Sequence, residues 1–198
     1  MGVLIQTFHG PQASLYVEEL AKLRIELFKN YPYLYDGSMD YEEKYLKTLI
    51  EAPENVIAMA FDHGKVVGAA AGLPLRYETH NIQQPFIDKG YDLDRIYYFG
   101  ESIISPAYRR QGIGNAFFTT REERAKSLGW YDFVAFCGIE RPTSHPLHDP
   151  TYREPDEYWS SLGFRRTDMI CQINWKDINE EEETPKSLRF WIKDIDNR

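Results

Sequence analysis

Residues 109–114, RRQGIG, place two arginines and two glycines between a β-branched run and an apolar helical pattern. The N-terminus of a helix exposes unpaired backbone N–H groups and carries a partial positive charge. Glycine lets an anion approach this backbone closely, and arginine adds charge and hydrogen-bond donors. The segment is therefore expected to bind a phosphate-like anion.

Two nucleotide-binding motifs are excluded at this segment. A P-loop needs Lys followed by Ser or Thr after its last glycine, where this chain has Asn115 and Ala116. A dinucleotide-binding fingerprint needs a third Gly or Ala where Phe117 stands, together with repeated βαβ units that the pattern lacks. For an isolated Gly-x-Gly, an ordinary glycine turn with exposed arginines would be the simpler interpretation.

The strand-like run before the glycines carries one carboxylate, Glu101. Strict alternation puts Glu101 on one face with Tyr97, Phe99 and Ile103, where an acid is costly unless it is used or paired. Burial would raise its pKa from about 4.3 toward neutrality, which suits a general base. A structural pairing with Arg24 or another cation is the alternative interpretation.

The surrounding elements follow an α+β pattern. Apolar alternation predicts strands at 3–8, 56–61, 66–75, 95–104, 131–139, 164–175 and 187–195. Four helices are expected. The first covers about residues 14–29, and the second begins at a capping box of Asp40 and Glu43 and ends before Pro53. The third runs from the glycines of residues 112–114 to Gly129, and the fourth covers residues 156–163. Residues 76–94 are expected to form an irregular loop with a short helix, and residues 141–155 a proline-rich loop. This order predicts one domain over residues 1–198, with a mixed, mostly antiparallel sheet of about six to seven strands flanked by helices.

Composition narrows the class of protein. The 198 residues are 42% apolar and 27% charged, the balance of a soluble globular protein, and the net charge of −8 argues against nucleic-acid binding. An acidic surface suits a cationic partner, although solubility explains it equally well. No signal peptide and no apolar run of membrane-spanning length is found, so a cytoplasmic protein without membrane contact is expected.

The cysteines and histidines give no metal signature. Cys137 and Cys171 form no Cys-x-x-Cys pair and lie in apolar strand-like runs, so they are expected to be buried thiols. The loop sequence HPLHDP holds His145, His148 and Asp149, but this proline-bracketed spacing is a weak ligand signal. No metal is therefore expected.

The pattern Arg109-x-x-Gly112-x-Gly114 resembles the Arg/Gln-x-x-Gly-x-Gly/Ala signature of the GNAT superfamily of N-acetyltransferases. The run EYWSSLGF at 157–164 is similar to a later motif of that family, and the order of elements is also similar. The resemblance covers most of the chain, most specifically residues 95–164. It implies a GNAT-like fold and an enzyme that transfers acetyl from acetyl-CoA to a primary amine, by direct attack in a ternary complex.

The resemblance also implies roles for individual residues. The diphosphate of the coenzyme is expected on Arg109, Arg110, Gln111, Gly112, Ile113 and Gly114. If the preceding strand bulges, as it does in the family, the backbone amides of Ile103 and Ile104 would bind the acetyl carbonyl and the pantetheine arm. Glu101 matches a glutamate that the family often carries on this strand, which supports its role as general base.

The proton donor is harder to assign. The family often has a tyrosine four residues before the glycine of Leu-Gly-Phe, where this chain has Trp159, with Tyr158 one residue earlier. A shift of one residue turns a helical side chain by about 100 degrees. Tyr158, Tyr152 or water could protonate the departing thiolate, and ordinary packing is the alternative role for Tyr158.

The family builds its acceptor pocket between the first two helices, where this chain carries Tyr31, Tyr33 and Tyr35. Aromatic faces suit a cation or a ring, and packing of a loop is the rival interpretation. His145 could contact the substrate or act as a second base, although loop polarity is the commoner explanation. The acceptor stays open among a small amine, an aminoglycoside-like cation, an amino acid and a protein N-terminus.

Other activities and assemblies also stay open. A longer acyl donor or a hydroxyl acceptor is an alternative within enzymes. A non-catalytic sensor that binds acyl-CoA is the alternative outside them, and a homodimer would be unsurprising for the family.

Overall fold

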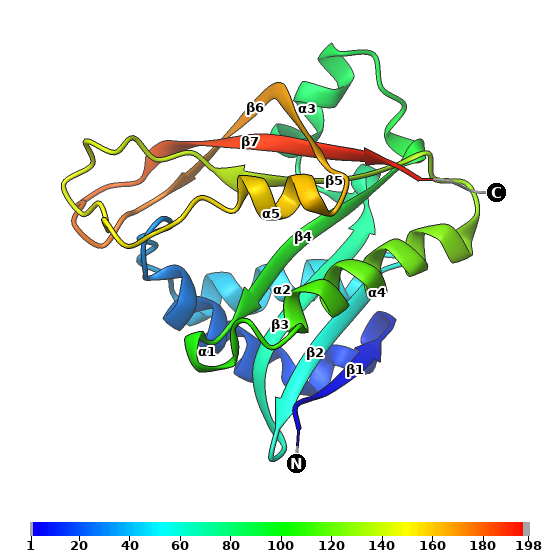
Figure 1. Cartoon of the computed structure of the whole chain (residues 1–198), viewed down its shortest axis with the longest axis horizontal. Helices are drawn as coiled ribbons and strands as arrows, with labels where there is room; N and C mark the ends of the chain where they lie inside the picture. Colours follow the sequence, from blue (N-terminus) through cyan, green and yellow to red (C-terminus); the bar gives the residue numbers. More distant parts are fainter. Residues whose placement is uncertain (1, 196–198) are drawn as a thin grey trace.

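The structure, a computed structural model, describes residues 2–195. Seven strands form one sheet in the order β1-β2-β3-β4-β5-β7-β6 (Figure 1). They are β1 (Leu4–Phe8), β2 (Val56–Asp62), β3 (Lys65–Pro74), β4 (Ile96–Ile104), β5 (Phe133–Ile139), β6 (Arg165–Trp175) and β7 (Thr184–Asp194). Neighbouring strands are antiparallel except β4 and β5. The mixed, mostly antiparallel sheet predicted from the sequence is confirmed.

Helices cover both faces of this sheet. They are α1 (Val17–Phe28), α2 (Met39–Glu51), α3 (His80–Asp88), α4 (Ile113–Leu128) and α5 (Asp156–Ser161), with short 3-10 helices η1 (Gly10–Tyr16), η2 (Leu75–Tyr77), η3 (Leu93–Arg95) and η4 (Pro106–Tyr108). In Figure 1, α4 and α5 lie in front of the sheet and α1 and α2 lie behind it. None of the helices in the described part of the chain is both long and apolar enough to cross a membrane.

Two helix starts differ from the prediction. The first predicted helix is divided into η1 and α1. The capping box at Asp40 and Glu43 is wrong, because α2 begins earlier with Ser38 as its N-cap, whose hydroxyl accepts from the Tyr41 N–H at 3.4 Å. Asp40 instead lies in the first turn, where a carboxylate favours the positive end of the helix.

β4 and β5 separate after a short parallel pairing. Residues 96–98 of β4 pair with residues 133–135 of β5. Beyond that point β5 stays paired with β7 as far as Ile139, while β4 stays paired with β3 as far as Ile104. Because each strand is held by its other neighbour, the sheet opens between them, and the C-terminal half of β4 has a free edge.

A bulge interrupts β4 just where it leaves β5. Gly100 and Glu101 together oppose the single residue Ala71 of β3. In such a bulge two successive residues turn toward the same side of the sheet. A Cβ added to Gly100 would meet Leu49 of α2 and Leu73, so this side is the one covered by α1 and α2.

The bulge decides which face carries Glu101. Its carboxylate contacts Arg24 of α1, and Ile103 also packs on the α1–α2 side. Tyr97 and Phe99 pack on the opposite side, against α4. The expectation that Glu101 shares a face with Tyr97 and Phe99 is therefore wrong, because strict alternation fails at the extra residue of the bulge.

Candidate active site

The segment before α4 presents a row of backbone N–H groups. Gly112 is the N-cap of α4 with φ of +83°, a left-handed conformation that glycine adopts without strain. The Ala116 N–H donates to the Gly112 carbonyl at 3.1 Å. The N–H groups of residues 110–115 have no acceptor within residues 2–195. Unpaired donors at the positive end of a helix form a site for an anion.

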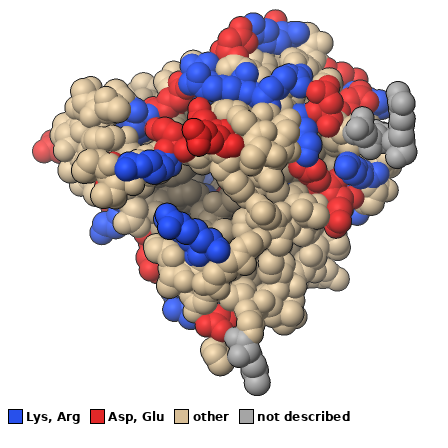
Figure 2. All heavy atoms as spheres, viewed as in Figure 1, with Lys and Arg blue, Asp and Glu red and all other residues tan. Residues whose placement is uncertain are grey.

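Arg109 ties this loop to the end of β4. Its Nε donates to the Ile104 carbonyl at 3.2 Å, while Arg109 and Arg110 both stay exposed. The Gln111 side chain folds back onto the Ala107 carbonyl at 3.1 Å, so it points away from the row of N–H groups. Figure 2 shows the surface hollowed between this loop and the segment around α5, with basic side chains at the rim of the hollow.

Only one of the two predicted strand amides faces the opening. The Ser105 N–H donates to the Val67 carbonyl of β3 at 2.9 Å. Backbone groups alternate along a strand, so the Ile103 N–H also faces β3, whereas the Ile104 N–H faces the free edge. The Ile104 carbonyl, which Arg109 binds, lies on that same edge.

Tyr158 lies at the N-terminus of α4. Its hydroxyl donates to Asn115 Oδ1 at 2.8 Å, and a Cβ on Gly114 would lie 3.2 Å from its oxygen. Burial raises the pKa of Tyr158, and the charge of Arg121 opposes this. Trp159 packs instead against Phe136 at a ring distance of 4.9 Å. The shift by one residue therefore aims Tyr158, and not Trp159, at the loop.

Glu101 is held in a buried ion pair. Its Oε2 lies 2.5 Å from Nη1 of Arg24, and Nε of the same arginine contacts Glu42. Burial raises the pKa of Glu101, and the charge of Arg24 opposes this shift most strongly. The guanidinium of Arg24 also lies over the Phe28 and Tyr45 rings, which restricts its movement. The pairing with Arg24 that the sequence left as an alternative is the contact found.

The carboxyl of half-buried Glu78, near the bulge of β4, was missed by sequence reasoning. Its Oε1 is buried without a hydrogen-bond partner in the described chain, 3.9 Å from the position of a Cβ on Gly100. Its Oε2 accepts from the Thr79 N–H at 3.3 Å. Burial raises the pKa of Glu78 to about 7, against the opposing effect of the Thr79 N–H. Glu78 follows η2 in a segment without periodicity, so no sequence signal marked it.

The three tyrosines of the 31–35 loop have different surroundings. The Tyr31 hydroxyl lies 3.1 Å from Nδ1 of His148. Tyr33 stacks on Trp175 at 6.1 Å, and burial raises its pKa. Burial and then the charge of Glu42 raise the pKa of Tyr35. Tyr33 and Tyr35 are thus packed on the α1–α2 side, while Tyr31 contacts the 141–155 segment.

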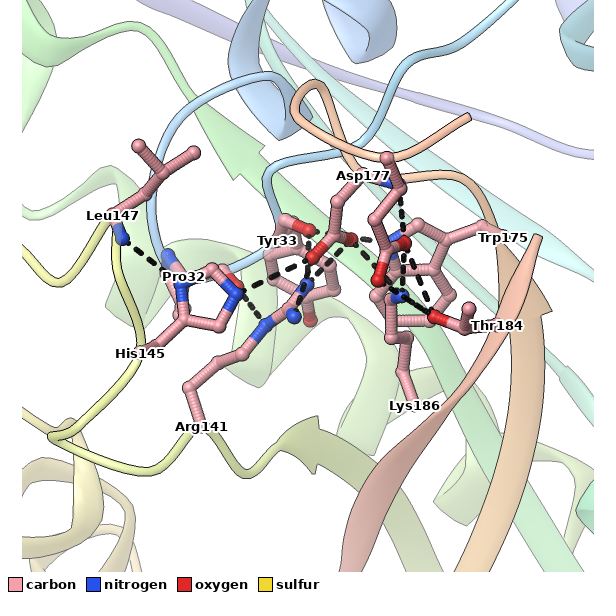
Figure 3. Close-up of polar contacts among 10 residues, drawn as sticks. Pro32, Tyr33, Arg141, His145, Leu147, Trp175, Asp177, Thr184 and Lys186 are labelled. Atoms are coloured by element: carbon pink, nitrogen blue, oxygen red, sulfur yellow. Dashed lines mark hydrogen bonds and ion pairs between the residues drawn. The ribbon is translucent and has the colours of Figure 1, made fainter. Parts of the chain in front are cut away.

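An ion pair between Arg141 and Asp177 joins three distant segments (Figure 3). Nη1 and Nη2 of Arg141 donate to the two oxygens of fully buried Asp177 at 2.6 and 2.7 Å. The same guanidinium donates to the carbonyls of Pro32 and Tyr33 at 2.8 and 2.7 Å. His145 Nε2 lies 3.7 Å from Asp177, so this predicted substrate residue belongs to the network.

Of the two thiols expected to be buried, Cys171 is buried and Cys137 is half-buried. Cys137 and Cys171 are both free thiols, and the Tyr98 hydroxyl lies 3.1 Å from Sγ of Cys137. Within residues 2–195, no three His, Cys, Asp or Glu side chains are grouped so that they could hold a metal ion.

The model of the acetyltransferase (GNAT) family matches residues 20–149. The chain therefore belongs to the GNAT acetyltransferase family, and the resemblance seen in its sequence is confirmed. No curated protein sequence matches the chain at a significant level.

Solved structures share the fold at low identity. An aminoglycoside 6'-N-acetyltransferase complexed with coenzyme A has a TM-score of 0.59 and 16% identity, covering 98% of each chain. The yncA protein of Salmonella typhimurium with acetyl-CoA has a TM-score of 0.61 and 11% identity, covering 99% of this chain and 95% of its own. The ribosomal-protein-S18-alanine N-acetyltransferase of Escherichia coli has a TM-score of 0.56 and 12% identity, covering 98% of this chain and 94% of its own.

Proposed function

We propose that this chain transfers an acetyl group from acetyl-CoA to a primary amine by direct attack within a ternary complex. The observation that carries the proposal is the row of unpaired N–H groups at residues 110–115, which begins α4 beside the free edge of β4. The GNAT family membership supports the acyl transfer chemistry.

The residues before α4 fit the coenzyme. The diphosphate is an anion, and the N-terminus of α4 offers unpaired donors together with the exposed charges of Arg109 and Arg110. The absence of a side chain at Gly114 keeps the space below the Tyr158 hydroxyl open. The Ile104 N–H at the free edge would donate to the acyl carbonyl. A donor in this position typically stabilises the oxyanion of the transition state by about 3 kcal/mol. Ile103, whose N–H faces β3, would hold this part of β4 in place within the sheet.

Acetyl-CoA supplies the thioester, and the chain must move two protons. An alkylammonium is unreactive until a base removes a proton, and we assign this step to Glu101, directly or through water. As the C–N bond forms and the C–S bond breaks, the departing thiolate takes a proton from Tyr158 or from water. Burial raises the pKa values of both side chains, which favours a proton-accepting Glu101 and a protonated Tyr158 at neutral pH.

The acceptor amine is proposed to bind on the α1–α2 side of Glu101. Tyr33 and Tyr35 are the aromatic residues of the 31–35 loop that pack on this side. Tyr31 of the same loop and His145 of the 141–155 segment would contact a larger acceptor. Catalysis is proposed to need no metal. A cytoplasmic location and a homodimer stay predictions.

The first test is calorimetric titration of the whole chain with acetyl-CoA. Micromolar binding supports the diphosphate site, and binding would then be followed by thiol release with kanamycin, putrescine and a peptide with an N-terminal alanine. Release with any of these amines supports transfer to an amine. Binding without release by any amine would favour the acyl-CoA sensor, and no binding would overturn both proposals.

A further inference from the structure

Arg121 of α4 is a buried cation that the proposed chemistry does not use. It is 1% exposed and is the largest fully buried side chain in the described chain. No described carboxylate forms an ion pair with it. A buried charge without a counter-ion destabilises the folded state by roughly several kcal/mol, unless polar groups solvate the charge. The fold must therefore gain something from placing an arginine here.

The partners of Arg121 are backbone carbonyls at the β4 bulge. Its Nη1 donates to the Glu101 carbonyl at 3.1 Å and lies 3.5 Å from the Ala71 carbonyl across the bulge. Its Nε donates to the Phe117 carbonyl at 3.0 Å, one turn back on α4. A bulge disturbs the regular ladder of hydrogen bonds, so its carbonyls need donors from elsewhere. Arg121 supplies a donor to both residues that face each other at the bulge.

The space around the guanidinium is shaped to hold it. The group lies over the rings of Phe99 and Phe118, at 4.3 and 4.9 Å from their centroids. A Cβ on Gly72 would lie only 3.2 Å from Cγ of Arg121, so the glycine makes room for the arginine stem. The arginine is thus fixed between α4 and β4 from several directions.

We propose that Arg121 is a positioning residue for Glu101: by binding the bulge carbonyls, it keeps the Glu101 side chain turned to the α1–α2 face. Without the bulge, alternation would direct Glu101 to the α4 face, where Phe99 already lies. The catalytic consequence of this inference rests on the proposed function, but the positioning itself does not.

Arg121 also acts on Glu101 through its charge. The titratable groups that act on the Glu101 carboxylate from the α1–α2 side are Arg24 from α1, Glu42 and Tyr45 from α2, and Glu78 from the segment after β3. The charge of Arg121 acts on it from the α4 side, across the sheet. Burial raises the pKa of Glu101, Arg24 opposes this most, Glu42 adds to it and Arg121 opposes it. Loss of the Arg121 charge therefore raises the pKa of Glu101 further.

The experiment compares Arg121→Met with Arg124→Met, a matched control on the same helix. Arg124 also donates to a carbonyl, that of Glu54 at 3.3 Å, but outside the site. Isotope-edited NMR follows the titration of the Glu101 carboxyl, assigned by its loss in Glu101→Gln, and the backbone shifts of residues 99–103. We expect a raised Glu101 pKa and altered strand shifts in Arg121→Met, and neither change in Arg124→Met.

Equal Glu101 pKa values and equal strand shifts in the two variants would overturn the proposal. Should Arg121→Met fail to fold, Arg121→Gln carries the same test, because glutamine keeps a donor for the carbonyl but removes the charge. It should raise the pKa of Glu101 while leaving the strand shifts nearer to those of the wild type. An unchanged pKa in Arg121→Gln would overturn the electrostatic part.

A kinetic arm applies when one of the amine probes is acetylated. Arg121→Met should lower kcat about tenfold through misplacement of the base, with little change in acetyl-CoA affinity. The acid limb of its pH–rate profile should move to higher pH, which general destabilisation would not cause. The NMR arm reports on Glu101 whether or not any amine reacts, so failure of the proposed function and failure of this inference are distinguishable.

Discussion

Nη1 of Arg24 lies 2.5 Å from Oε2 of Glu101, and this buried ion pair joins α1 to the bulge of β4. A paired carboxylate can still act as a base, because burial works against the effect of the arginine on its pKa. Among the described residues, Arg24 binds only one of the two carboxylate oxygens of Glu101, Oε2. The pair therefore fixes the orientation of Glu101 and leaves an oxygen for the acceptor amine.

Glu101→Gln should lower turnover about a hundredfold or more, because the amide cannot accept the ammonium proton. Acetyl-CoA affinity, measured by calorimetry, should stay close to the wild-type value, since the proposed diphosphate site is formed by the loop after β4, whereas the Glu101 side chain contacts Arg24 on the α1–α2 face. Glu123→Gln, an exposed change on α4, is the control. Full turnover in Glu101→Gln would remove Glu101 as the base.

Arg109→Ala should weaken acetyl-CoA binding about tenfold, because it removes a charge at the rim of the anion site and the tie to the Ile104 carbonyl. The loss should shrink at high salt, as expected for an exposed charge. Arg165→Ala removes another exposed arginine, one that pairs with Asp194 on the sheet edge, and should leave the affinity unchanged. Equal affinity in both variants would contradict the assignment of the loop.

Tyr158→Phe tests the proton donor. The variant loses the hydroxyl that donates to Asn115 and keeps the ring that packs on Phe118. If Tyr158 protonates the thiolate, kcat should fall about tenfold or more while acetyl-CoA affinity holds. Because its pKa is raised, the hydroxyl is protonated at neutral pH, and the alkaline limb of the wild-type rate profile should be lost in the variant. An unchanged kcat would leave Tyr152, tested by Tyr152→Phe, or water as the donor.

Glu78→Gln should change how stability depends on pH. The folded-state pKa of Glu78, about 7, lies above the ordinary glutamate value of 4.5, so the folded state holds this proton more tightly than the unfolded state. Its favourable contribution is full below about pH 4.5 and is lost as pH rises to about 7. Between pH 4 and 8, the wild type should thus lose about 3 kcal/mol of stability that Glu78→Gln keeps. Denaturant unfolding at both pH values measures this, and parallel curves would contradict it.

Asp177→Asn should destabilise the chain by about 3 kcal/mol, because it leaves the buried charge of Arg141 without its carboxylate partner. Lys186 also loses a contact at 3.4 Å but keeps its ion pair with Glu180 at 2.6 Å. Asp168→Asn is the matched control, since Asp168 forms an exposed pair with Lys89 that is worth little. Thermal unfolding measures both variants. Equal midpoints would show that the network of Figure 3 contributes no net stability.

Local chemistry made much of the site predictable. The run from Arg109 to Gly114 specifies a glycine N-cap and a helix start within a few residues, and the structure forms both there. Arg121 gave a signal of its own, because it stands four residues after Phe117 and four before Ala125, on the apolar stripe of α4. A charged residue at such a position points to a buried polar partner.

The sequence by itself determined the element types, the mixed sheet and the anion-binding helix start, because these follow from periodicity and from residues close together in the chain. Tertiary structure decided the face of Glu101, since a bulge depends on the register between β3 and β4. It also decided the burial of the Glu78 carboxyl and the ion pair of Arg141 with Asp177, because the residues that meet in each case lie far apart in the chain. Register and long-range burial depend on how whole elements pack, and no local pattern records that.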